Sequence, residues 1–493
     1  MAAEDQGHVG FQPNQCTVPT RCISEAGKQE VKCRPHLTCV IELIGWDGLS
    51  MMIPPERTWM LQRVCKALRA ALAQMNLPAA VHATQNGDGA QVDFEERLDG
   101  IVRRSRICSL CIRSWRLGPR FVSMLVGQLS LSRLDLSDAN SYACSDEIVS
   151  LLVEALAHCP SLTHLHLRRN RICDESAARI AEVLVQCPRL THLDLSSNKI
   201  SYAGAARIAE YLNMFTALAA LDLSGNRINA QGARKLANGL QQCPSLIRLD
   251  LRCSRLFCRC SDDPFRCLCA NALMAPAHDS VSQDELDGSL VSSPFLICLN
   301  LAGCGIPRRN AGIIARELGR CESLVHLNLT GNNFRARELA GSLGGCEKLT
   351  YLGLGYNHLG EELGGLIKSL RQCRSLAHLD LRGNKIGDAG ADSISDELGQ
   401  TSYSALTRLD LSYNEIGDGG ACRLAGVLGE CPALETLSLA CNMVRPLGAR
   451  RLASVVLSAR CPSLAHLNLQ GNPCVFQHPF NTPSFVLASK RHK

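Results

Sequence analysis

The pattern LxxLxLxxN-x-I recurs down most of this 493-residue chain, and it limits the possible folds more than any other feature. In one copy, Arg189–Ile200, Leu193 and Leu195 alternate with polar residues, which predicts a half-buried strand. Asn198 follows the strand. A buried Asn can hydrogen-bond backbone groups that are left unpaired where the chain turns.

An amphipathic helix is predicted after each strand. The apolar residues after Ile200 fall at i, i+3, i+4 and i+7, which places them on one helical face; they are Ala205, Ile208, Ala209 and Leu212. A unit of one strand and one helix cannot bury its apolar face alone and must stack on its neighbours. The sequence therefore predicts an α/β solenoid with a parallel sheet on its concave side and helices on its convex side.

Eleven copies are clear, and the commonest spacing between them is 28 residues. Their first leucines are Leu162, Leu190, Leu218, Leu246, Leu296, Leu324, Leu349, Leu376, Leu406, Leu434 and Leu464, and a degenerate copy precedes them at Leu131, Leu134 and Leu136. In nine copies Asn occupies the ninth position, and Ser254 and Cys304 replace it in the other two. The pattern resembles the ribonuclease-inhibitor-like leucine-rich repeats, which NOD-like receptors and the Ran GTPase-activating protein also contain. This resemblance implies a horseshoe-shaped leucine-rich repeat solenoid over residues 120–475, with about twelve repeats.

The region before the repeats is expected to be small and mainly helical. Residues 1–38 are polar and are expected to be disordered, and residues 83–119 read as a linker and an approach to the first repeat. Between them, residues 39–82 contain a helical apolar face. The stretch Met52–Leu72 resembles the second half of an F-box, on Val64, Cys65, Lys66 and Leu68. A generic helical domain is the alternative.

An insertion interrupts the series, because 50 residues separate Leu246 from Leu296. The extra segment, near residues 257–290, is expected to be a surface loop, although a break in the gene model would give the same pattern. A zinc site is the alternative, and its four thiolates would come from Cys258, Cys260, Cys267 and Cys269. Eight other cysteines follow the repeat, since each lies three residues before a first leucine, where a small buried side chain is expected.

Composition and motifs exclude several classes of function. The net charge is +6, no secretory signal or membrane-length apolar run is visible, and residues 476–493 form a polar tail ending in SKRHK. The expected location is cytoplasmic, with the nucleus as the alternative. No P-loop, GxSxG, HExxH or kinase signature occurs. We therefore expect neither enzymatic activity nor a cofactor.

The strand positions that face away from the helices carry the candidate binding site. Over the eleven clear copies they hold six arginines, six acids and no lysine, which argues against nucleic acid as a partner. Large aromatics on this face cluster in three copies, together with arginines of the kind that dominate binding hot spots. The predicted protein-binding site is Tyr351, Tyr356, His378, Arg382, Arg408 and Tyr413. The histidine- and arginine-rich first copies, around His164, His166, Arg168 and His192, are the second choice, and these histidines could titrate near neutral pH.

Three functions fit these features. The first is a scaffold that binds a protein partner, of unknown identity, on the concave face. The second is an F-box-like substrate receptor of a cullin-type ubiquitin ligase, with a ligase adaptor as a further partner. The third is GTPase activation, by resemblance to the Ran activator, although the basic tail differs from the acidic tail of that family.

Overall fold

The computed structural model of this protein describes residues 40–43, 79–84, 107–113, 125, 130–138, 146–254, 295–399, 403–457, 461, 463–475 and 484–486. The chain separates into two compact units, Met1–Thr38 and Cys39–Lys493, and all described residues belong to the second. Several predictions concern residues outside these ranges. They are the disorder of residues 1–38, the F-box-like stretch Met52–Leu72 and the insertion near 257–290 with Cys258, Cys260, Cys267 and Cys269.

The described strands form one sheet of sixteen strands in chain order. Each strand from β1 to β14 pairs in parallel with the next. The strands of the repeats are β4 (Arg133–Asp135), β5 (His164–His166), β6 (His192–Asp194), β7 (Ala220–Asp222), β8 (Arg248–Asp250), β9 (Cys298–Asn300), β10 (His326–Asn328), β11 (Tyr351–Gly353), β12 (His378–Asp380), β13 (Arg408–Asp410), β14 (Thr436–Ser438) and β15 (His466–Asn468). The predicted leucine-rich repeat solenoid is confirmed.

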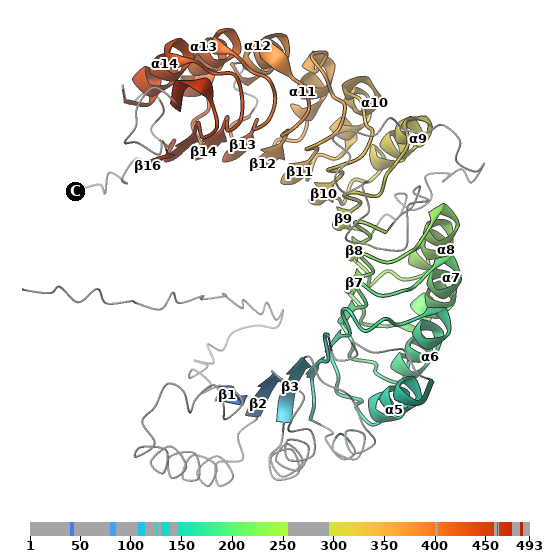
Figure 1. Ribbon diagram of the computed structural model, residues 1–493. Helices are drawn as coiled ribbons and strands as arrows, with labels where there is room; N and C mark the ends of the chain where they lie inside the picture. Colours follow the sequence, from blue (N-terminus) through green and yellow to red (C-terminus); the bar gives the residue numbers. More distant parts are fainter. Residues whose placement is uncertain are drawn as a thin grey trace, which may run out of the picture. The chain divides into compact units, whose positions relative to one another are not determined.

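Helices lie along the outer side of the sheet, and the strands line the inner, concave side (Figure 1). The helices are α5 (Asp146–Ala157), α6 (Asp174–Leu184), α7 (Tyr202–Tyr211), α8 (Ala230–Leu240), α9 (Arg308–Leu318), α10 (Ala336–Ala340), α11 (Gly364–Leu370), α12 (Gly387–Leu398), α13 (Asp418–Val427) and α14 (Pro446–Leu457). None of these helices combines the length and the apolar content that a membrane span requires.

The sheet begins before the boundary at residue 120 that the leucine pattern predicts. Strands β1 (Val40–Leu43), β2 (Ala79–Thr84) and β3 (Ile107–Arg113) add to its N-terminal end. They lie outside the predicted series because they lack the LxxLxL leucines. At the other end, β16 (Ser484–Val486) pairs antiparallel with β15 and covers the last strand edge.

The core is a continuous stack of the repeat leucines. Leu190, Leu193 and Leu195 are buried, as are Ile208 and Leu212 of the following helix. The cysteines that precede the first leucines are buried against the neighbouring repeat. Cys346, for example, donates a hydrogen bond to the Leu318 carbonyl at 3.1 Å, and burial raises the pKa of its thiol to about 12. The Cys346 thiol therefore remains protonated at neutral pH and acts as a small packing group.

The asparagines link each repeat to the one before it. Asn384 donates from Nδ2 to the carbonyls of Leu354 and Leu381, both at 2.9 Å. Its Oδ1 accepts the backbone N–H of Asn357 at 3.1 Å. Where Ser254 replaces Asn, its hydroxyl keeps only the donor function and reaches the Leu223 carbonyl at 3.2 Å. One side chain thus satisfies buried backbone groups of two repeats.

We predict that Asn384→Ala lowers the free energy of unfolding by about 1–3 kcal/mol, because buried backbone groups lose their partner. Asn384→Ser should cost less, since its hydroxyl can still donate to a carbonyl as Ser254 does. Urea unfolding of the two variants and of the unsubstituted protein measures the difference. Equal stability of Asn384→Ala and the unsubstituted protein would contradict this account of the asparagines.

Candidate protein-binding site

We number each repeat from its first leucine, so that positions 3 and 5 lie on the strand and position 8 lies in the turn before Asn at position 9. Three of the predicted site residues occupy position 3 of adjacent strands. Tyr351 pairs in register with His378, which pairs in register with Arg408. Tyr356 and Tyr413 occupy position 8, and Arg382 occupies position 7. The six residues therefore lie in three adjoining repeats. The repeat of β11 holds Tyr351 and Tyr356, that of β12 holds His378 and Arg382, and that of β13 holds Arg408 and Tyr413.

Position 3 carries a row of packed rings in this region. The His326 and Tyr351 rings stack with centroids 4.0 Å apart, and the Tyr351 and His378 rings meet edge to face at 4.8 Å. Burial is the main cause that lowers the pKa of both histidines. Both are therefore uncharged at neutral pH and contribute aromatic surface.

For His164 and His192, burial argues against the expected titration near neutral pH. In the first repeats, the rings of His164 and His192 stack at 4.3 Å, and burial is again the first cause of their lowered pKa values, to about 4 for His164. The Thr163 hydroxyl donates its only proton to the Ser132 carbonyl. In the 2.9 Å hydrogen bond between Thr163 and His164, the ring Nδ1–H is therefore the donor. Sequence position alone could not reveal this packing of neighbouring rings.

Arg382 is held in place by Asp380. Its Nη2 lies 2.9 Å from Asp380 Oδ2, and the Asp380 side chain is only 3% exposed. The guanidinium also lies 5.9 Å from the centre of the Tyr356 ring, within the range of a cation–π interaction. Arg408, in contrast, is exposed and forms no ion pair within the described part of the chain.

The aspartates at position 5 have a structural role that the sequence did not indicate. Asp380 Oδ1 accepts the backbone N–H of Arg382, two residues later, at 3.1 Å. The same bond closes the turn in other repeats, from Ser196 to Asp194, from Ser224 to Asp222, from Arg252 to Asp250 and from Ser412 to Asp410. These carboxylates are therefore part of the repeat and are not simply free surface charges.

Position 8 adopts a left-handed backbone conformation in all twelve described repeats from β4 to β15. The residues and their φ angles are Asp138 (58°), Arg169 (56°), Ser197 (55°), Gly225 (67°), Cys253 (54°), Gly303 (63°), Gly331 (69°), Tyr356 (51°), Gly383 (65°), Tyr413 (58°), Cys441 (53°) and Gly471 (72°). This region favours glycine, and a bulky residue there is an outlier. Tyr356 and Tyr413 therefore each hold a strained backbone of about 1–2 kcal/mol.

The two tyrosines form one aromatic surface because a glycine lies between them. A Cβ atom at Gly383 would lie 2.4 Å from Cδ1 of Tyr356, so the Tyr356 ring covers the space that any other residue would fill. The Tyr356 and Tyr413 ring centres are 6.4 Å apart, and Tyr413 is 53% exposed. We call Tyr356, Gly383 and Tyr413 the tyrosine shelf.

Two further glycines shape the site and were missed by the sequence analysis. A Cβ atom at Gly353 would lie 2.6 Å from Asn328 Oδ1, and one at Gly355 would lie 2.8 Å from Arg382 Cγ. The Asn328 side chain thus packs against Gly353 of β11, and the Arg382 side chain packs against Gly355 in the turn that follows. The signal was present in the string YLGLGY of this repeat, where other repeats have side chains at positions 5 and 7.

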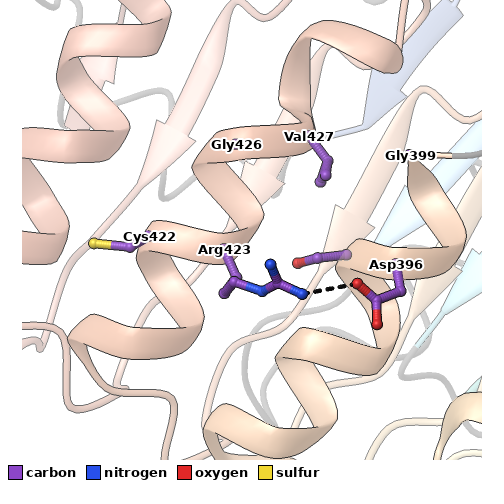
Figure 2. Close-up of a pocket in the computed structure, with 7 residues that line it drawn as sticks. Asp396, Gly399, Cys422, Arg423, Gly426 and Val427 are labelled. Atoms are coloured by element: carbon purple, nitrogen blue, oxygen red, sulfur yellow. Dashed lines mark hydrogen bonds and ion pairs between the residues drawn. The ribbon is translucent and has the colours of Figure 1, made fainter.

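A cleft of about 420 Å³ lies on the helical side, between α12 and α13 (Figure 2). Its lining residues are Ser395, Asp396, Gly399, Cys422, Arg423, Gly426 and Val427. Arg423 bridges Asp396 at 2.9 Å and Asp392 at 3.4 Å. The only cation that lines the cleft is therefore already paired, which leaves the strand face as the better candidate site.

A comparison with family models supports leucine-rich repeats in part of the chain. A family model described as Leucine Rich repeat matches residues 158–181, 186–209, 218–237, 372–395 and 405–425. An internalin from Listeria monocytogenes is a similar solved structure, with 16% identity, a TM-score of 0.42 and coverage of 73% of this chain and 80% of that one. A leucine-rich repeat protein from Leptospira interrogans has 17% identity, a TM-score of 0.41 and coverage of 79% and 88%. No curated protein sequence matches the chain. The chain therefore contains leucine-rich repeats.

We predict that Tyr413→Gly leaves the free energy of unfolding within about 1 kcal/mol of the original value, because relief of the left-handed strain offsets the lost ring contacts. Tyr403, which is buried at 4% exposure, is the matched control. Tyr403→Gly should cost more than about 3 kcal/mol. A comparable loss for both variants in urea unfolding would show that Tyr413 serves the fold.

Gly383→Ala should disturb the shelf, whereas Gly331→Ala should not. Both substitutions place a side chain at positive φ, but only the first meets the Tyr356 ring; the nearest atom at Gly331 is backbone, 3.6 Å away. We expect Gly383→Ala to cost about 1 kcal/mol more than Gly331→Ala, and this excess to disappear in a Tyr356→Ala background. A double-mutant cycle by urea unfolding measures the coupling, and a persistent excess would contradict the contact.

Proposed function

We propose that this protein binds a protein partner on its strand face, with Tyr351, Tyr356, His378, Arg382, Arg408 and Tyr413 as the main contact. The observation that carries the proposal is the presence of two tyrosines at left-handed turn positions. Glycine would remove the strain at both positions, as it does in five other repeats. Residues in strained backbone conformations cluster at functional sites, and Tyr356 and Tyr413 are the bulky aromatic residues among those at position 8.

The chemistry of the site supports a protein ligand. Tyrosine presents a large apolar area with few rotatable bonds, so that ordering it on binding costs little entropy. Arg382 is preorganised by Asp380, and Arg408 is exposed beside the packed rings of Tyr351 and His378. Aromatic anchors with adjacent arginines are typical of binding hot spots.

The finer family assignment is part of the same proposal. The 28-residue spacing and a helix after nearly every strand favour the ribonuclease-inhibitor-like class of repeats. The ubiquitin-ligase alternative depends on Met52–Leu72, outside the described residues, and no described contact favours it or GTPase activation.

A photo-crosslinking amino acid at Tyr413 of the full-length chain can identify the partner, since this position already accommodates an exposed ring. Tyr202 is the matched control, because it is 45% exposed on the helical side. A protein that crosslinks to position 413 but not to position 202 is then purified for binding measurements.

We predict that Tyr356→Ala with Tyr413→Ala weakens binding of that partner at least about thirtyfold, which corresponds to about 2 kcal/mol. Melting of the variant should match that of the unsubstituted protein. Isothermal titration calorimetry provides the affinity. Unchanged affinity in a folded double variant would show that the partner contacts another surface. The next candidate is then the group of repeats around His164, His166, Arg168 and His192.

A further inference from the structure

The positive charge of this protein is concentrated after residue 435. Residues 436–493 contain seven Lys or Arg and no Asp or Glu, whereas residues 1–435 contain 45 Lys or Arg and 46 Asp or Glu. The net charge of +6 therefore comes entirely from these 58 residues. Such asymmetry along a chain suggests binding to an extended anionic partner, either a nucleic acid or a membrane.

Helix α14 presents part of this charge on one exposed face. It is the last α-helix of the described chain and lies at the end of the row of helices (Figure 1). Leu447, Arg450, Arg451 and Ser454 are spaced at i, i+3, i+4 and i+7, which places them on one side of the helix. All four are exposed. We call these four residues the α14 face.

The arginines of the α14 face lack the acidic partners that the equivalent arginine of the preceding repeat has. Arg423 and Arg451 both occupy position 18 of their repeats. Arg423 pairs with Asp392 and Asp396, which occupy positions 17 and 21 of the repeat before it. In the repeat before Arg451, a cysteine and a glycine occupy these two positions. Within the described part of the chain, neither Arg450 nor Arg451 forms an ion pair.

The acids of the preceding repeat lie toward the two ends of α14. Glu415 and Asp418, at positions 10 and 13, precede α13, and the Asp418 carboxylate already accepts the backbone N–H groups of Arg445 and Gly448 at 2.9 and 2.7 Å. Glu430, at position 25, follows α13. Positions 14 to 24 of this repeat hold one arginine and no acid. The two arginines of the α14 face, at positions 17 and 18, therefore lie beside a stretch without negative charge.

Two exposed apolar side chains accompany these arginines. Leu447 is 68% exposed and Met443 is 56% exposed, the highest values among the large apolar residues that the structure describes. Met443 lies in the loop before α14, and Leu447 lies in the first turn of the helix. Helices that bind at a membrane surface combine such groups, because apolar side chains enter the lipid while basic side chains pair with anionic headgroups.

We propose that the α14 face, together with Met443, binds the surface of an anionic membrane. This function goes beyond the binding of a protein partner on the strand face. A lipid surface fits better than a nucleic acid, because phosphate groups offer no contact for Leu447, and the α14 face has no aromatic ring for base stacking. It fits better than a protein surface, because the α14 face carries one sign of charge, whereas the strand face mixes six arginines with six acids. Since α14 cannot span a membrane, it lies along the surface.

The test uses the full-length chain and vesicles of phosphatidylcholine, either alone or with about 30% phosphatidylserine. Co-sedimentation should show binding to the anionic vesicles only, weakened at least about tenfold when the salt concentration rises from about 0.05 to about 0.3 M, since exposed charges are screened. Arg450→Glu with Arg451→Glu should weaken this binding at least about tenfold at low salt. Leu447→Ser should weaken it at least about threefold, because the side chain no longer enters the lipid.

Matched variants make the outcome specific. Lys368→Glu with Arg374→Glu makes the same change in net charge on exposed residues at the end of α11, and it should leave vesicle binding unchanged. Met214→Ser removes a side chain that is 50% exposed in η2 (Leu212–Met214), and it is the control for Leu447→Ser. This substitution should also leave vesicle binding unchanged.

Thermal melting shows whether each variant is folded, and Arg450→Gln with Arg451→Gln replaces the charge reversal if that variant unfolds. No binding of anionic vesicles, equal binding of neutral vesicles, an equal loss in the Lys368 and Arg374 control, or no effect of Leu447→Ser would overturn the proposal. Binding of a single-stranded oligonucleotide or of a peptide rich in Asp and Glu, without binding of vesicles, would assign the α14 face to that class of partner instead.

Discussion

The structure depends on buried backbone groups that a single repeat cannot satisfy. A three-residue strand followed by a turn leaves N–H and carbonyl groups inside the stack, where an unpaired group costs about 1–3 kcal/mol. The Asn at position 9 resolves this by donating to carbonyls of two repeats and accepting an N–H of the preceding one, as Asn198 does with Leu167, Leu195 and Asn170. These hydrogen bonds fix the register of adjacent repeats, and the packing of the buried leucines adds stability to the stack.

The same turn controls which side chains the strand face can present. Because position 8 is left-handed in every repeat from β4 to β15, glycine is the unstrained choice, and any larger side chain is held there at a cost. The protein places tyrosine at two of these positions and a glycine between them. The fold and the candidate binding surface thus place conflicting demands on the same residues, a conflict that is common at functional sites.

The sequence predicted the repeated units well because leucine spacing and the Asn position report directly on burial. It also predicted which strand residues face away from the helices, since side chains alternate between the two faces of a strand. It could not reveal that Tyr356 and Tyr413 have positive φ, because backbone conformation at a non-glycine residue has no local signature. Nor could it show that Asp380 closes a turn and fixes Arg382, or that burial lowers the pKa of His164, His192, His326 and His378, since these effects depend on side-chain packing. Strands β1 to β3 escaped prediction because they join the sheet without the leucines that define it.

The direction of the asparagine contacts has a consequence for synthesis on the ribosome. Asn198 Oδ1 serves the N–H groups of Asn170 and Ile172, and Asn384 Oδ1 serves that of Asn357, so each repeat is completed by the one that follows it. A nascent chain therefore cannot finish one repeat until the next, commonly 28 residues later, has left the exit tunnel. During synthesis, the repeat that has emerged last therefore exposes backbone N–H groups that the next asparagine has not yet reached.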